Sequence, residues 1–138
     1  MKKETARLGV IYASNKLGLE DGIEVLYRNR KFFQFDNQGA IFIPDTYTIV
    51  FNTDWLDSMH DQEILRCAFH ETRHAYQRAC LEFPKLMVVD VSNETLKKWK
   101  EEFDNYTNDE HNGYDFQEIE KDANAFADRL LKELENEG

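Results

Sequence analysis

Residues 61–82, DQEILRCAFHETRHAYQRACLE, constrain the fold of this chain more than any other segment. Their pattern predicts one long helix that begins with Asp61 as its N-cap and closes before Pro84. On a helical wheel, Arg66 and Arg73 lie off the inward sector. That sector holds Cys67, His70, His74, Gln77 and Leu81. Both histidines of the helix are therefore expected to point toward the core.

The pentapeptide HETRH within this helix predicts metal chemistry. His70 and His74 stand four positions apart with Glu71 between them. On an α-helix this spacing corresponds to about 6 Å of rise on one face, so two imidazoles can hold one ion. A zinc ion bound in this way retains a site for water, and a carboxylate next to the first histidine can deprotonate that water. We therefore expect His70 and His74 as ligands and Glu71 as the catalytic base.

A catalytic zinc site needs a third protein ligand, and the last helical segment, residues 116–135, supplies the candidate. The acid nearest the centre of its apolar stripe is Glu120, with Asp122 further round the wheel. An inward carboxylate is costly unless it is paired or bound to a metal. Glu120 is thus the leading third ligand and Asp122 the reserve, and this pattern leaves the choice open.

The remaining segments predict a single α+β domain over residues 1–138. A first helix is expected over 4–17, ending at Gly18, and another over 92–106. Between residues 23 and 52, short β-branched and aromatic runs separated by turn signals indicate a small antiparallel sheet of three to four strands. About four helices would pack with this sheet, and the HETRH helix would be the long central one.

Charge and composition exclude several classes of partner. The chain has 17 basic and 27 acidic residues and a formal net charge of −10. Nucleic acid and anionic membranes need a concentrated positive surface, so neither is expected as the main partner. No stretch has the length of a membrane span, and the N-terminus has no apolar signal core. Cys67 and Cys80 are expected to be free thiols, which favours a reducing cytoplasm.

Two motifs together resemble the ImmA/IrrE family of zinc metallopeptidases. HETRHAYQ is followed by EKDANAFADRLL, and the family pairs an HExxH helix with a later helix reading roughly ExxANxFA. The resemblance covers residues from about 20 to 131, including a strand-like GAIFIPDTYTIVFN before the metal helix. It implies a zincin-like fold of the HExxH-plus-glutamate type. His70, His74 and Glu120 correspond to the zinc ligands, and Glu71 corresponds to the catalytic glutamate.

The resemblance also implies an activity and a class of partner. Members are zinc endopeptidases, and several cleave helix-turn-helix repressors of mobile elements or stress responses. We therefore expect hydrolysis of a peptide bond in a specific protein target. The chain departs from the family in having Arg73 where glycine is common and LLKEL where LLMP is common. The alternatives are a non-catalytic, zinc-containing regulatory protein that sequesters a partner, and a small structural metal-binding domain.

Further residues are weaker candidates for the site. Asn124 follows Glu120 by one turn and could hydrogen-bond a ligand. His111 and Tyr114 lie in a polar loop, where either could stabilise an oxyanion, although a plain solvent loop explains them as well. His60 is expected to be a surface residue before the long helix. The segment 40–52 is expected to offer a strand edge to an extended substrate.

Overall fold

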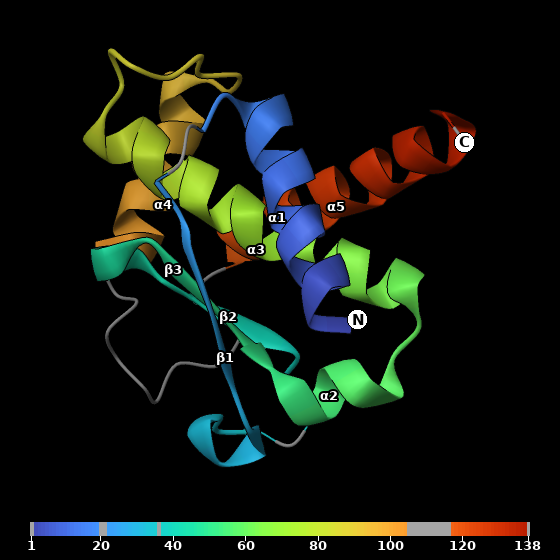
Figure 1. Cartoon of the computed structure of the whole chain (residues 1–138). Helices are drawn as coiled ribbons and strands as arrows, with labels where there is room; N and C mark the ends of the chain where they lie inside the picture. The colour runs from blue at the N-terminus through green and yellow to red at the C-terminus, as the bar shows by residue number, and fades with distance from the viewer. Residues whose placement is uncertain (1, 20–21, 36, 105–116, 138) are drawn as a thin grey trace.

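The computed structural model of the chain describes residues 2–19, 22–35, 37–104 and 117–137. The protein belongs to the α+β class and combines helices with a small three-stranded sheet among its described residues (Figure 1). The described elements are, in chain order, α1 (Lys2–Leu17), β1 (Glu24–Arg28), η1 (Arg30–Phe32), β2 (Ala40–Ile43), η2 (Pro44–Thr46), β3 (Thr48–Asn52), α2 (Thr53–Ser58), α3 (Asp61–Glu82), α4 (Asn93–Asp104) and α5 (Gln117–Glu137).

The helices follow the periodicity of the sequence closely. The first predicted helix is confirmed as α1 and ends before Gly18, whose φ of 72° is the left-handed conformation that glycine adopts without strain. The helix predicted over 61–82 is present as α3, but its N-cap is His60 rather than Asp61. The Glu63 side chain accepts a hydrogen bond from the His60 backbone N–H at 3.4 Å, which explains the shift.

The two later helices also lie where the sequence places them. α4 begins after Ser92, whose Oγ accepts from the Thr95 backbone N–H at 3.2 Å. Residues 105–106 of this predicted helix lie outside the described residues. α5 covers the predicted last helix and extends to Glu137. The short helix α2 was not predicted, and the Asn52 side chain initiates it by accepting from the N–H groups of residues 54 and 55.

The prediction of an antiparallel sheet is wrong for one of the two strand pairings. The described strands form a mixed sheet in the order β1-β3-β2, in which β2 and β3 are antiparallel and β1 and β3 are parallel. The aromatic run at 32–35 is not a strand, because Asn29 caps the 3-10 turn η1 through the Lys31 N–H. In the order β1-β3-β2, β3 is the central strand. The strand edge expected over 40–52 therefore exists only along β2.

α3 is the element that the others surround. It packs against α1 on one side and α5 on another, and it also contacts β2 and α4 (Figure 1). Side chains from α1, the sheet, α3, α4 and α5 join one hydrophobic cluster. Among the described residues, no helix is both long and apolar enough to cross a bilayer. The fold thus presents α3 to α5 along a shared interface, where the predicted metal ligands lie.

Candidate metal centre

α3 brings His70 and His74 together one turn apart. Their Nε2 atoms are 3.1 Å apart, and the two rings are nearly perpendicular, at 88°. The residue His74 is only 2% exposed, and the side chain of His70 is 14% exposed. This spacing is the one that an i, i+4 pair on one helical face produces. Two imidazole nitrogens therefore point at the same spot near the interface with α5.

Glu120 reaches this spot from α5. Its Oε1 lies 3.0 Å from His70 Nε2, and its Oε2 lies 3.0 Å from His74 Nε2. The Glu120 side chain is 40% exposed, so this side of the cluster opens to solvent. Asp122, the reserve ligand, instead contacts Arg73 and Gln77. Between the two acids that the wheel left open, the structure brings Glu120 to the histidines.

The donor atoms have the chemistry and spacing of a metal site. The donor atoms of His70, Glu71 and His74 all lie within 4.8 Å of one another, and this group could hold a metal ion. Ligands bound to tetrahedral zinc at about 2.0–2.1 Å lie roughly 3.3 Å from each other. The nitrogen–nitrogen and nitrogen–oxygen separations of 3.0–3.1 Å are close to that value. Imidazole and carboxylate suit zinc and several other divalent metals, so the donors alone do not select one.

His74 and Glu120 shift each other's protonation. Burial by itself would lower the pKa of His74, but the hydrogen bond and negative charge of Glu120 outweigh it and raise that pKa to about 9. Burial also opposes ionisation of Glu120, yet the hydrogen bonds from both histidines hold its pKa well below the usual range. Without a cation, the two side chains form an ion pair. Metal binding at His74 must therefore displace a proton.

Glu71 lies beside the histidines and is buried. The residue is 8% exposed, and burial raises its pKa, although the positive charges of His70 and His74 partly offset this. A carboxylate with a raised pKa is better able to accept a proton from a weak acid. Glu71 therefore has the properties expected of a general base.

Arg73 contradicts the helical-wheel expectation that it lies off the core. The residue is only 3% exposed, and its guanidinium makes two-point contacts with Asp90 at 3.0–3.1 Å and with Asp122 at 2.7–3.1 Å. It also lies over the aromatic rings of Tyr76, at 4.4 Å, and Phe126, at 5.2 Å. Two carboxylates and flanking rings compensate for burying the charge, which the wheel cannot anticipate. The pKa of Arg73 rises despite burial because of these two acids.

Of the weaker candidates of the sequence, the structure describes Asn124 and His60, and neither joins the histidines. Asn124 is exposed, and its Oδ1 lies 3.5 Å from Arg66 Nη2. That contact is not the hydrogen bond to a metal ligand that its position suggested. His60 is exposed at the start of α3, as expected. His111 and Tyr114 lie outside the described residues.

Gln77 is the contact that sequence reasoning missed. Its Oε1 is 2.9 Å from His74 Nδ1, and the residue is fully buried. The wheel places Gln77 in the same sector as the histidines, and its three-residue spacing from His74 was the signal that could have assigned it. Asp90, the second partner of Arg73, follows α3 in the chain and has no periodic signal.

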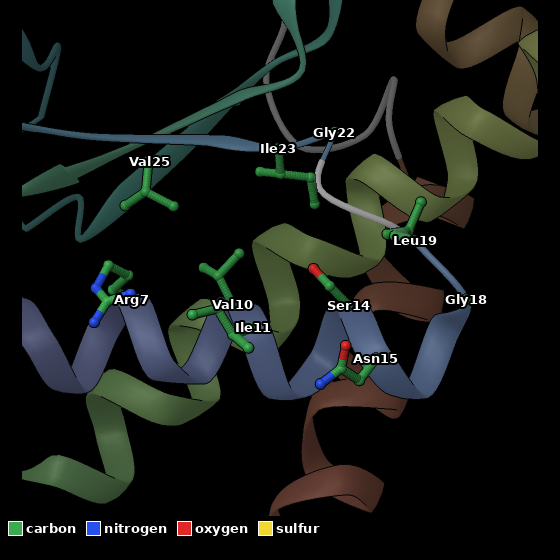
Figure 2. A pocket seen from close by; sticks show the side chains of 10 residues that line it. All are labelled: Arg7, Val10, Ile11, Ser14, Asn15, Gly18, Leu19, Gly22, Ile23 and Val25. Atoms are coloured by element: carbon green, nitrogen blue, oxygen red, sulfur yellow. The ribbon is translucent and has the colours of Figure 1, made fainter.

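A cavity lies elsewhere in the molecule, away from the histidine cluster. A cavity of about 670 Å³ separates α1 from β1, and in Figure 2 the side chains of Ile23 and Val25 point from the strand side toward α1. None of its lining residues belongs to the histidine cluster. Cys67 and Cys80 do not form a disulfide with each other. Both are free thiols, as predicted.

Comparisons with known proteins do not assign the chain to a family: no protein-family model, curated protein or solved structure matches it.

Proposed function

We propose that the chain is a zinc-dependent endopeptidase of the ImmA/IrrE type, with a zincin-like arrangement of the HETRH helix. The observation that carries this proposal is the convergence of His70 Nε2, His74 Nε2 and both oxygens of Glu120, with separations of 3.0–3.1 Å. Glu71, next to His70 in the sequence, adds a buried carboxylate with a raised pKa. A metal site with an adjacent base supports hydrolysis better than a purely structural ion does.

His70, His74 and Glu120 would hold the ion, and a substrate would approach from the side of Glu120, whose side chain is 40% exposed. Bound zinc would supply Lewis-acid chemistry, polarising the scissile carbonyl and making water a stronger acid. Glu71 takes a proton from the water as its oxygen bonds to the carbonyl carbon. Glu71 then delivers this proton to the amide nitrogen as the carbon–nitrogen bond breaks. The products are a carboxylic acid and an amine, the acid then gives its proton to the amine or to solvent, and Glu71 is regenerated as a carboxylate.

The substrate in this proposal is a specific protein rather than peptides in general. The resemblance suggests a helix-turn-helix repressor as the class of target. β2 contacts α3 and has one edge that no described strand occupies, so an extended segment of the target could pair with this edge. Such pairing would place the peptide backbone along the helix that carries Glu71.

Glu71→Gln tests the proposal. The amide is nearly isosteric but cannot accept the proton from water, so cleavage should fall by a factor of at least about 100 while zinc binding persists. Zinc content by elemental analysis and capture of the uncleaved target are the measurements, with His74→Ala as the variant that loses the metal. Full function of Glu71→Gln in cells would leave a non-catalytic binding protein as the better description. Absence of zinc from wild-type protein purified without chelators would remove both functions.

A further inference from the structure

Gln77 lies between a proposed metal ligand and the opposite helix. Its Oε1 is 2.9 Å from His74 Nδ1 on the same helix. Its Nε2 donates to the backbone oxygen of Ile119 at 3.0 Å and to Asp122 Oδ2 at 2.8 Å, both on α5. The residue is fully buried, so water does not compete for these contacts. The Gln77 amide therefore connects His74 to Ile119 and Asp122, which lie on either side of Glu120 in the α5 sequence.

The hydrogen bonds fix which way the amide faces. A backbone carbonyl can only accept, and the Asp122 carboxylate also receives the Arg73 Nε–H at 2.7 Å. The Gln77 NH₂ group must therefore face α5, and its carbonyl oxygen must face His74. It follows that His74 Nδ1 carries a hydrogen and donates it. In a neutral imidazole of this tautomer, the lone pair is on Nε2, the atom that faces Glu120 and His70.

We infer that Gln77 is a positioning residue that fixes His74 in its metal-binding tautomer and holds α3 in register with the Glu120 helix. This inference rests on the proposed metal site and deepens it. A hydrogen bond to the non-ligating nitrogen of a histidine sets the ring's orientation and strengthens its metal bond. Here the same side chain also bonds to α5, so the two halves of the site are held by one group.

His70 provides a contrast within the same cluster. Its Nδ1 is buried, and among the described residues nothing hydrogen-bonds to it. The orientation of His70 is therefore set from its Nε2 side, by Glu120 at 3.0 Å and His74 at 3.1 Å. We expect His74 to be ordered before metal binds, whereas His70 adjusts to the ion. Changing Gln77 should therefore affect His74 more than His70.

Gln77→Met is the informative substitution because methionine has a similar length and no hydrogen-bonding amide. Arg66→Met is the matched control: Arg66 also bridges α3 to α5, and its hydrogen bonds go to Asp128 at 2.7 Å and Asn124 at 3.5 Å rather than to a histidine. Zn²⁺ affinity of the full chain, stripped of metal and titrated against a chromophoric chelator, should fall about 10- to 100-fold in Gln77→Met. Arg66→Met should stay close to wild type.

A second measurement separates positioning from general loosening of the fold. In Zn²⁺-loaded wild type, the His74 ring should show a protected Nδ1–H resonance, and this resonance should be lost to exchange in Gln77→Met. Equal Zn²⁺ affinity of wild type and Gln77→Met would overturn the inference and leave the metal site intact. An equal loss in Arg66→Met would also overturn it.

Two remaining outcomes are decisive as well. If wild type binds no Zn²⁺, the proposed function and this inference both fail. If Gln77→Met does not fold, the wild-type spectrum decides: a His74 Nδ1 without its hydrogen contradicts the inference, and a protected Nδ1–H supports it.

Discussion

At the scale of single residues, the site is defined by partners that the sequence separates widely. His74 and Glu120 are 46 positions apart in the numbering, yet their side chains meet at 3.0 Å. Each stabilises the charged form of the other against burial, as the opposite directions of their pKa shifts indicate. In the absence of metal, this ion pair is one of several links between α3 and α5. Its contribution to stability must therefore depend on pH.

We predict that metal-free protein is stabilised by this pair most strongly between about pH 4.5 and 6.5. The pKa of His74 rises from 6.5 to about 9 on folding, so its contribution is complete below 6.5 and lost as pH rises through 9. The pKa of Glu120 is lowered from 4.5, so its contribution is complete above 4.5 and lost at more acidic pH. Thermal unfolding between pH 4 and 10, in chelator, measures the alkaline limb and the onset of the acidic one.

Glu120→Gln is the control for this profile. The variant removes the charge that raises the pKa of His74, so the decline in Tm toward pH 9 should become shallower. Glu71 is present in both proteins, but its pKa shift is smaller in the variant because the charge of Glu120 contributes to that shift. An identical alkaline decline in the variant would show that the pair does not carry the effect.

Site residues were predictable from the sequence where their positions on one face of a single helix were enough to bring them together. The HETRH spacing identified His70 and His74, and the wheel ranked Glu120 above Asp122, the order in which the structure brings them to the histidines. Arg73 was misplaced because the wheel assigns faces by hydropathy, whereas Asp90 and Asp122 supply its charge partners from other elements. Contacts between elements depend on tertiary packing, and one helix's periodicity contains no information about them.

At the scale of elements, periodicity predicted the four long helices but not how the strands pair. Alternation along a strand shows which side chains share a face, but it does not specify whether a neighbour runs parallel or antiparallel. A parallel pair needs a crossover connection between its two strands. The chain makes this crossover between β1 and β3 through η1 and β2. α2 escaped prediction because it is six residues long, too short for an amphipathic period.

The crossing of α1 and α3 depends on Gly9. A Cβ added at Gly9 would lie 2.8 Å from the Cβ of Ala68 and 3.2 Å from a methyl of Leu65. Alanine in a helix interior is normally more favourable than glycine by about 0.5–1 kcal/mol. Overpacking costs about 1–3 kcal/mol, so we predict that Gly9→Ala destabilises the protein by about 1–2 kcal/mol. Urea unfolding measures the change.

The double variant Gly9→Ala with Ala68→Gly tests the cause of that loss. Removing the Ala68 methyl group makes space for the new one, so the double variant should be more stable than the sum of the two single changes predicts. If the two changes in unfolding free energy simply add in the double variant, the loss of stability comes from the α1 backbone and not from contact with α3.

At the scale of the whole molecule, the proposed metal would connect helices that are far apart in sequence. α3 and α5 are separated by α4 and by residues outside the described ranges, so the interface between them closes a long loop. A cation held by His70, His74 and Glu120 would bind the folded protein and not the unfolded chain. Binding must then stabilise the entire fold by mass action.

We predict that Zn²⁺ raises the Tm of the metal-free protein and that EDTA reverses the rise. At free metal of about 100 times Kd, the gain is about 2.7 kcal/mol, or roughly 8–10 °C for a domain of this size. His74→Ala should abolish the shift because one ligand is lost. His60→Ala removes a histidine that is exposed at the start of α3 and should retain the full shift. If both variants lose the shift equally, zinc is binding to surface histidines in general, and the cluster between α3 and α5 is not its site.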